Sequence, residues 1–533
     1  MASRGLYERH GLYERPMPAR GSDGFFHPAS EEELAMLVRA ARLEQVKLRV
    51  RGSAHSVAAA IYTDDGPDGQ PVRRHFDVML DRYIGVEFDD ARMRVTVQAG
   101  CHLGNDPRDP TRTSTWDNSL LAQLENRGWA LPDLGGVSHQ TVSGFLMTGS
   151  CGGTVTHAIE DAVVGWRIVD GTGTVHALER DGNDPRFHAV GCSLGLLGII
   201  STVTLQCIPR YDIVGREDIT AESDTAYELF GDGQAGLEGF FRRTEYARLM
   251  WWPQAGVRRV VTWQARRMRG NDYNEQSGSH GALRPKAYSA LGDGIRNPKL
   301  SRVANLAAQA AGGVFYDSLA GTSRRFEPLA RASVPARVLG DRVRQKFATR
   351  VLPTILRQFT KTSAVPQRFW ESWCHGLPMD NQMSDASLPT EFTEIWVPLE
   401  RTGEVMRALR EHYDRAGHDA TGSFICEVYA ARRTQAWLHP AYERDSLRID
   451  LFWFARNHGD PTRGWFVQFW QLLQPFGYRL HWGKYLPVDP ELGALHLRRH
   501  TPRWDDFLAL RRVMDPDRVF LTSYWRTTLG IEP

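Results

Sequence analysis

The sequence predicts an α+β protein with two lobes, and three observations support this class. Residues 76–100 hold three short runs, FDVML, YIGVEFD and RMRVTVQAG, in which apolar and polar residues alternate as in half-buried strands. Glycine-rich segments at 51–56 and 131–154 interrupt this first half. After Pro209, large aromatic residues gather in strand-like runs such as LFWFARN at 451–457, between helix-prone stretches. With 533 residues, 42% of them hydrophobic, the chain is long enough to bury more than one core.

The elements of the first lobe follow in order from local signals. Ser30, ahead of the acidic residues Glu31–Glu33, is typical of a helix N-cap with negative charge in the first turn. A strand at Val46–Val50 then runs into the first glycine turn. Ser119–Arg127 predicts a second helix, and VVGWRIVDGTGTVHAL at 163–178 predicts a hairpin.

Composition excludes several functional classes. The net charge of +2 gives no reason to expect nucleic-acid binding. No run of 18 apolar residues and no apolar signal core occur, so we expect neither a membrane span nor secretion. Six cysteines without CxxC spacing make a zinc site or a disulfide framework unexpected, and they fit a reducing cytoplasm. We therefore expect no bound metal.

Two segments have a bland and a functional interpretation. The N-terminal arm, 1–19, contains the duplication GLYER at 5–9 and 11–15, which suggests a frayed basic arm. The stretch 332–359 has the pattern of a basic amphipathic helix. Such a helix presents either a solvated face or a surface for peripheral membrane contact.

The stretch RVRGSAHSVA, 49–58, places a histidine in a tight turn of small residues. Small residues at a strand end let backbone N–H groups approach a phosphate. Neither glycine-rich segment is a GxGxxG element with a following acid, and no GK[ST] occurs, so the Rossmann and Walker signatures are absent. The two segments either wrap a pyrophosphate jointly or form ordinary tight turns. His55 either caps its turn or reacts with something bound there.

Three motifs in this order resemble the vanillyl-alcohol oxidase/p-cresol methylhydroxylase (PCMH) family of flavoproteins: RGSAHS, LPDLGGVSHQTVSGFLMTGSCGG and GLLGIISTVTL. RLHWGK at 479–484 and DPDRVFLTSYWRTTLG at 515–530 resemble its sugar-1,4-lactone oxidase and alditol oxidase branch. The resemblance implies a two-lobed PCMH-type FAD-binding domain plus a substrate domain with a large antiparallel sheet flanked by helices. The implied boundaries are 20–212 for the FAD domain, 213–484 for the substrate domain with an enlarged helical insert at about 265–362, and 485–533 for a C-terminal segment that returns to the FAD domain.

FAD is the cofactor that the resemblance implies, with His55 joined covalently to the flavin 8α-methyl group. Such a link prevents cofactor loss and makes the ring a better electron acceptor. The other cofactor-binding positions carry over from the motifs: Arg51, Gly52, Ser53, Ala54, Ser56, Gly135, Gly136, Thr141, Gly144, Thr148, Gly149, Ser150, Cys151 and Ile200.

Three positions qualify this assignment. Cys151 stands where the family pattern T-G-T-H-G has a histidine, and the residues alone do not explain the exchange. No cysteine occupies Leu134–Val137, where relatives with two covalent links carry one, so we expect a single link. Gly135 is small at a position that the branch associates with oxygen reaching the flavin, which favours an oxidase over a dehydrogenase. Cys101 is expected to serve packing alone.

Oxidation of a carbinol needs an acceptor for the hydroxyl proton and a cation or donor for the developing charge on oxygen. In SFICEVYAARR, 423–433, Glu427 and Tyr429 share one strand face. The resemblance implies catalytic roles for Glu427, Lys484 and His481. Tyr429 replaces the arginine of the branch, and Arg432 or Arg433 is a candidate substitute. Five tryptophans either pack in cores or form aromatic walls of the site: Trp251, Trp252, Trp370, Trp396 and Trp453.

The resulting expectation is an FAD-dependent oxidoreductase. It would oxidise the CH–OH group of a small-molecule alcohol, such as a polyol or sugar lactone, and pass electrons to O2 to give hydrogen peroxide. Three alternatives stay open. They are a dehydrogenase with a quinone or protein acceptor, an oxidase of a larger hydrophobic alcohol such as a sterol, and a flavin-free binding protein on the same scaffold.

Overall fold

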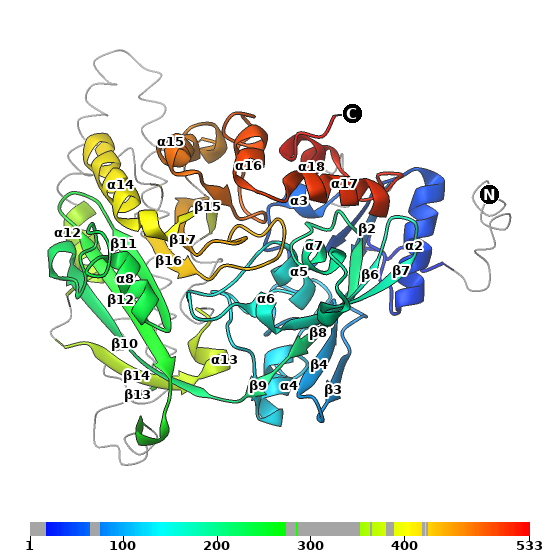
Figure 1. Cartoon of the computed structure of the whole chain (residues 1–533), viewed down its shortest axis with the longest axis horizontal. Helices are drawn as coiled ribbons and strands as arrows, with labels where there is room; N and C mark the ends of the chain where they lie inside the picture. The colour runs from blue at the N-terminus through cyan, green and yellow to red at the C-terminus, as the bar shows by residue number, and fades with distance from the viewer. Residues whose placement is uncertain are drawn as a thin grey trace.

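A computed structural model gives the structure of the chain. It describes residues 17–63, 75–272, 284–285, 352–362, 365–379, 389–417, 422, 425–455, 457 and 459–532. The GLYER duplication, most of the expected 265–362 insert and residues 332–351 of the basic stretch lie outside these residues. Helices and mostly antiparallel sheets alternate in two lobes, which confirms the α+β class (Figure 1).

The first lobe is built on a five-stranded antiparallel sheet of order β3-β4-β8-β6-β7. Beside it a parallel pair, β1-β2, carries the histidine turn at the end of β1, and a short pair, β5-β9, closes the lobe. Their bounds are β1 Leu48–Arg51, β2 Phe76–Met79, β3 Val86–Asp89, β4 Arg94–Gln98, β5 Trp129–Ala130, β6 Val163–Val169, β7 Val175–Glu179, β8 Ile199–Gln206 and β9 Ile208–Pro209.

The helices of this lobe begin where the sequence indicates. Helix α2 starts after Ser30, whose side chain accepts a hydrogen bond from the Glu33 backbone N–H, and α4 starts after Ser119 in the same way. The β6–β7 hairpin turns at the expected Asp170. The helices are α2 Glu31–Glu44, α3 Ala58–Ile61, α4 Leu120–Arg127, α5 Val142–Met147, α6 Ile159–Ala162 and α7 Arg186–Val190.

The second lobe is a nine-stranded sheet of order β13-β14-β10-β12-β11-β16-β17-β15-β18, at the left of Figure 1. All its pairs are antiparallel except β13-β14. Its strands are β10 Asp212–Ala221, β11 Tyr246–Trp252, β12 Arg259–Arg267, β13 Arg284–Pro285, β14 Gln367–Ser372, β15 Thr390–Pro398, β16 Cys426–Ala431, β17 Ser446–Phe454 and β18 Arg479–Leu480.

The chain returns to the first lobe after this sheet. The Leu48 N–H donates to the Val519 carbonyl, and Trp525 of α18 donates from Nε1 to the Ala60 carbonyl. Helices α17 and α18 therefore lie over the first lobe (Figure 1). The helices of this part are α8 Leu237–Arg243, α12 Leu352–Phe359, α13 Trp373–Gly376, α14 Thr402–Ala416, α15 Trp465–Leu473, α16 Ala494–His500, α17 Trp504–Met514 and α18 Ser523–Thr528.

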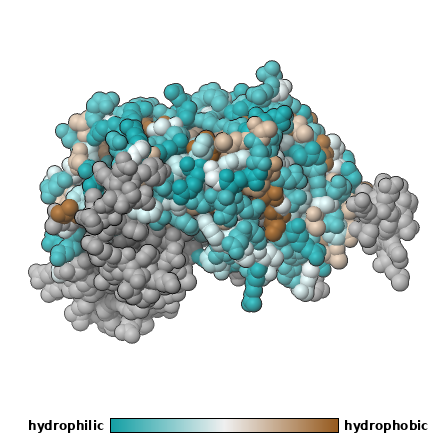
Figure 2. Space-filling view, turned by 90° about the horizontal axis from the view of Figure 1, so that it is seen from below, coloured by the Kyte–Doolittle hydropathy of each residue, from teal (hydrophilic) through white to brown (hydrophobic). Residues whose placement is uncertain are grey.

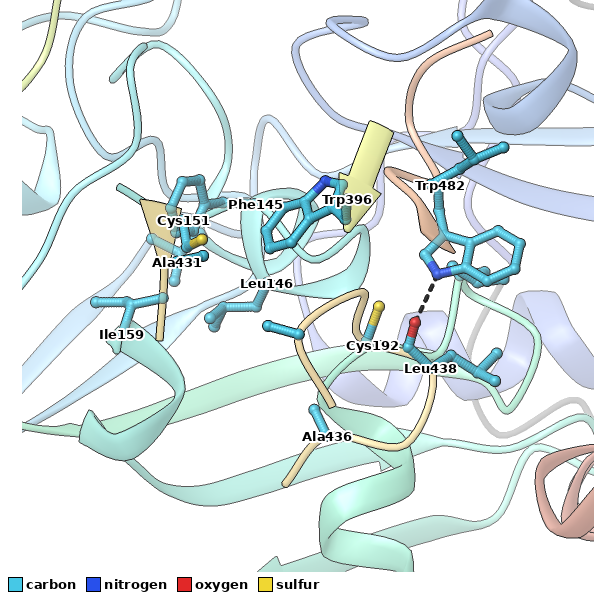
Figure 3. Packing of buried hydrophobic residues seen from close by; sticks show 14 of the residues in the cluster. Phe145, Leu146, Cys151, Ile159, Cys192, Trp396, Ala431, Ala436, Leu438 and Trp482 are labelled. Atoms are coloured by element: carbon cyan, nitrogen blue, oxygen red, sulfur yellow. Dashed lines mark hydrogen bonds between the residues drawn. The ribbon is translucent and has the colours of Figure 1, made fainter. Parts of the chain in front are cut away.

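One apolar core runs through both lobes. Phe145, Leu146 and Cys151 of the first lobe pack in the same cluster as Trp396 of β15 (Figure 3). The indole of Trp482 donates to the Leu438 carbonyl at 2.7 Å inside this cluster. On the face in Figure 2, the described residues are mostly hydrophilic, with isolated hydrophobic ones. None of the described helices has the length and apolar character needed to cross a bilayer.

Candidate active site

A narrow groove runs along the end of β1 and the histidine turn. Its cavity is small, about 130 Å³, and both glycine-rich segments line it together with residues 194–200 and the returning C-terminal segment. Apolar contacts at one end come from Ile199, Ile200, Phe520 and Trp525. We call this feature the narrow groove.

The turn that lines the groove is shaped for close approach of a ligand to backbone. Ala54 has a φ of 56°, a left-handed conformation that turns successive N–H groups toward one side. A Cβ at Gly52 would lie 2.6 Å from Oγ1 of Thr141, so only glycine fits there. Among the described residues, no protein acceptor takes a hydrogen bond from the N–H groups of Gly52–Ser56. This donor set suits the pyrophosphate of a dinucleotide.

A larger cavity of about 740 Å³ continues from the groove, and residues 53–55 and Gln140 line both. We call it the reaction cavity. Its walls come from the second glycine-rich segment on one side and from β15, β16 and β17 on the other. An elongated ligand that enters the groove with one end therefore reaches the sheet of the second lobe with the other, past His55.

His55 stands at this junction. Its Nδ1 lies 3.2 Å from Nε2 of His139, and the two rings meet edge to face. Burial, and then the charge of Lys484, lower the pKa of His55 well below its ordinary value. The imidazole is therefore neutral and has a lone pair available for bond formation. His139 lies in the second glycine-rich segment, and the sequence motifs did not single it out.

Strand register places the polar groups of the cavity in two rows on one sheet face. Glu427 of β16 lies opposite Asp450 of β17, which lies opposite Glu394 of β15. Two residues further along, Tyr429 lies opposite Arg448. Residues two apart point to the same face of a strand, so a row of three carboxyl groups adjoins a row with a cation. All five side chains line the reaction cavity.

Arg448 of β17 places a guanidinium beside Tyr429, which stands where the branch has its arginine. It bonds Glu394 through Nε and Nη2 at 2.8 and 2.7 Å and donates to the Tyr429 hydroxyl at 3.0 Å. The expectation that Arg432 or Arg433 substitutes for this arginine is wrong. Arg432 bonds the Thr156 carbonyl and Asp161 away from the cavity, and neither residue lines it.

Arg448 also explains the unusual cysteine of the T-G-S-C-G element. Its Nη1 donates to the carbonyls of Cys151 and Gly152 at 2.8 and 3.0 Å and lies 3.4 Å from the Cys151 Sγ. The small thiol leaves room for the guanidinium beside the loop. Burial raises the pKa of the Cys151 thiol well above its ordinary value, so the thiol is a packing and accepting group, not a nucleophile.

The carboxyl row is not uniformly charged. Burial opposes ionisation of Glu394, but the Arg448 charge lowers its pKa below the ordinary value. Burial raises the pKa of Glu427 to about 7 and raises that of Asp450 well above its ordinary value. Three adjacent carboxyl groups cannot all be ionised in a buried site. The charged form is thus favoured at Glu394 and the protonated form at Asp450, while Glu427 titrates near neutrality.

Lys484 and His481 face this row from the turn after β18. Burial lowers the pKa of Lys484 to about 8, and its Nζ lies 3.9 Å from the centre of the Phe392 ring. His481 accepts a hydrogen bond from the Gly483 N–H at Nδ1, so Nε2 carries the proton and donates to the Ser150 hydroxyl at 3.0 Å. Burial lowers the pKa of His481 to about 3, which keeps the ring neutral.

The other residues expected to bind the cofactor divide between groove and cavity, with one exception. Gly149 lines neither, and its φ of 77° shows that it serves the turn. The narrow groove is lined by Arg51, Gly52, Ser53, Ala54, His55, Ser56, Thr141, Gly144, Thr148 and Ile200. The reaction cavity is lined by Gly135, Gly136, Ser150 and Cys151 as well as by the four residues expected to act in catalysis.

Gly135 packs against an aromatic ring, and the five tryptophans lie outside the lining of the cavity. A Cβ at Gly135 would lie 2.5 Å from Cε2 of Phe145, so the space left by the glycine is filled by that ring. The alternative in which tryptophans form aromatic walls of the site is wrong. None of the five tryptophans lines the cavity, and Trp251 and Trp396 are fully buried in the core. The aromatic lining instead consists of Trp116, Phe145, Phe392, Tyr429 and Phe452.

Comparison with known families agrees with this geometry. A family model described as an FAD binding domain matches residues 22–105 and 114–179, which build the narrow groove. A model described as D-arabinono-1,4-lactone oxidase matches residues 327–528, which include β15, β16, β17 and Lys484. The chain belongs to the vanillyl-alcohol oxidase/p-cresol methylhydroxylase family of flavoproteins. The second match identifies the lactone-oxidase branch of this family.

Relatives in this flavoprotein family extend over nearly the whole chain. The L-gulonolactone oxidase of Mus musculus is 23% identical over 94% of this chain and 93% of its own. The L-gulono-1,4-lactone dehydrogenase of Mycobacterium tuberculosis is 25% identical over 94% and 95%. Among solved structures, cholesterol oxidase from B. sterolicum has a TM-score of 0.64 at 14% identity, over 95% of this chain and 93% of that one, and so shares the fold.

As a member of this flavoprotein family, the protein is an FAD-dependent oxidoreductase acting on CH–OH donors. The glycine cradle and the unbonded N–H groups of the turn fit the pyrophosphate, and the reaction cavity beyond His55 fits the flavin end. Among the described residues, no group of histidine, cysteine and acidic side chains has the arrangement of a metal site.

Proposed function

We propose that the protein is an oxidase of sugar-1,4-lactones or closely related polyols, with FAD linked covalently to His55 and O2 as the electron acceptor. The observation that supports this best is the pairing of Glu427 and Lys484 in one cavity that begins at His55. The relatives of this chain include lactone oxidases as well as a lactone dehydrogenase.

When bound, the flavin supplies the hydride acceptor. The side chains of this protein supply the rest of the chemistry. Glu427 is almost fully buried, and its Oε1 has no hydrogen-bond partner among the described residues. As a carboxylate, it accepts the proton of the substrate hydroxyl. Lys484 holds a positive charge where negative charge develops on the substrate oxygen.

The surrounding groups hold these two in place. Arg448 fixes Glu394 and the Tyr429 hydroxyl, and Tyr429 donates to Asp450 at 2.7 Å. His481 stays neutral between the Gly483 N–H and Ser150, so it orients the turn that carries Lys484. Buried walls limit water around the reacting oxygen, which strengthens the effect of the Lys484 charge.

Anaerobic mixing with a panel of sugar lactones, polyols and sterols tests the proposal. A lactone or polyol should bleach the flavin absorbance, and admission of air should restore it with stoichiometric hydrogen peroxide. Reduction by sterols alone would contradict the substrate class. Reduction by a lactone, followed by reoxidation only with a quinone, would assign the dehydrogenase alternative.

The rate of flavin reduction should depend on pH as a bell with limbs near 7 and 8. Glu427 must be ionised to accept a proton, so the rate rises as pH increases through its pKa of about 7. Lys484 must be protonated, so the rate falls as pH increases through its pKa of about 8. Because Glu427 and Lys484 interact, the two apparent pKa values of this profile belong to the pair of groups and not to either residue alone. Stopped-flow measurements should show that Glu427→Gln removes the acidic limb, and an unchanged limb would exclude Glu427 as the base.

A further inference from the structure

Two acceptor atoms in the carboxyl row have no partner. Asp450 is 2% exposed and Glu427 4%, and Asp450 Oδ1 and Glu427 Oε1 are buried without a hydrogen bond among the described residues. A buried polar atom without a partner costs free energy. Both side chains lie opposite each other on β16 and β17 and line the reaction cavity. A ligand in the cavity is therefore the partner that these atoms lack.

The second carboxyl oxygen of Asp450 is already occupied. Oδ2 accepts from the Tyr429 hydroxyl, which in turn accepts from Arg448. This chain fixes the rotation of the Asp450 carboxyl group and leaves Oδ1 for the ligand. Glu394 is paired with Arg448, so Asp450 and Glu427 are the two carboxyl groups of the row that keep an oxygen for the ligand.

The cavity is poorly suited to a carboxylate ligand. Arginine binds carboxylates through two parallel N–H···O hydrogen bonds. Every nitrogen of Arg448, however, already has protein partners: Glu394, Tyr429, and the carbonyls of Cys151 and Gly152. Lys484 is assigned to the reacting oxygen, and a negatively charged ligand would also meet the charge of Glu394 and, above about pH 7, that of Glu427. Hydroxyl groups, which both donate and accept, suit the two open oxygens.

We propose that Asp450 is a specificity-determining residue that binds a substrate hydroxyl next to the one that Glu427 deprotonates. The enzyme thereby selects a neutral lactone or polyol with adjacent hydroxyl groups and rejects the ring-opened carboxylate of the same sugar. This inference rests on the proposed function and assigns the part of the substrate that the sheet recognises.

The test compares three ligands: a sugar-1,4-lactone, its analogue lacking the neighbouring hydroxyl, and the hydrolysed sugar acid. In the parent enzyme, the deoxy analogue should reduce the flavin at least about 10-fold less efficiently, because it leaves the buried Asp450 oxygen unpaired. Calorimetry on the reduced enzyme should show the same order of affinities. The sugar acid should show no binding at the concentrations that saturate the lactone.

Variants separate recognition from packing. Asp450→Leu should bring the ratio between lactone and deoxy analogue close to one, whereas Asp450→Asn, which keeps a neutral donor and acceptor of the same shape, should retain the ratio. Asp218→Leu makes the same exchange on β10 outside the cavity and should leave the ratio unchanged.

The outcomes are decisive even if Asp450→Leu does not fold. A parent enzyme that accepts the deoxy analogue or the sugar acid as well as the lactone overturns the inference. So does an Asp450→Leu variant that still discriminates. If polyols reduce the flavin but no lactone does, the lactone assignment fails separately, and the same comparison with a polyol and its deoxy form decides the role of Asp450.

Discussion

Replacing Lys484 with methionine should slow anaerobic flavin reduction by about 100- to 1,000-fold, the usual loss when a group that stabilises developing oxyanion charge is removed. Methionine keeps the length and packing of the side chain and removes only the charge. In the described part of the chain, no protein acceptor takes a hydrogen bond from Nζ, which packs against Phe392. The ammonium is therefore available to the substrate oxygen.

The measurement is stopped-flow reduction together with the flavin content of the purified variant. Flavin content should stay at the parent level, because the groove that holds the nucleotide does not include Lys484. Lys47→Met is a matched control, since Lys47 bonds the Arg518 carbonyl and lines neither the narrow groove nor the reaction cavity. Equal reduction rates in parent and Lys484→Met would remove the lysine from the mechanism.

Replacing His55 with alanine should convert a flavin that stays with acid-precipitated protein into one that washes off. The neutral, buried imidazole of His55 lies where groove and cavity meet, so it has both the lone pair and the position to form the link. Loss of the link also lowers the reduction potential of the flavin, so reduction of any flavin that remains should be slower than in the parent.

Intact-mass measurement decides this prediction. The parent polypeptide should carry the additional mass of one FAD, and His55→Ala should not. His188→Ala, at a half-buried histidine of α7 outside the groove, should keep the added mass. A parent protein without added mass, produced with ample riboflavin, would show that the flavin is held by contacts alone.

The motifs that are contiguous in sequence could be interpreted without a structure. The turn at 51–56 is short and local, and alternation along 423–433 is enough to put Glu427 and Tyr429 on one face. Lys484 came from the resemblance of RLHWGK to the lactone-oxidase branch. In each case the chemistry depends on residues within a few positions of each other, which is the range over which backbone geometry is predictable.

Arg448, Asp450 and Glu394 could not be found in this way, because the register of three strands decides which side chains meet. Arg448 and Cys151 are 297 positions apart and still share a hydrogen bond. One signal was available: after Ser446, the strand SLRIDLFWF is apolar except for Arg448 and Asp450, two positions apart and thus on one face. Charged residues on a buried strand seldom occur without a partner or a function.

The alternative in which tryptophans form the walls of the site failed for a related reason. Composition marks tryptophan as bulky and apolar but does not tell a core position from a cavity wall. Trp396 lies opposite Arg448 in the β15–β17 register, yet its ring packs in the core beneath the guanidinium.

The hydrogen bonds of Arg448 join the loop of the first lobe to the sheet of the second inside the catalytic centre. Separating the lobes would break the hydrogen bonds from this guanidinium to the carbonyls of Cys151 and Gly152, each worth about 1.5–3 kcal/mol as a bond to a charged group. We expect these bonds to keep the two halves in one arrangement around the reaction cavity during turnover. Substrate preference should then change mainly through exchanges of side chains along the cavity wall.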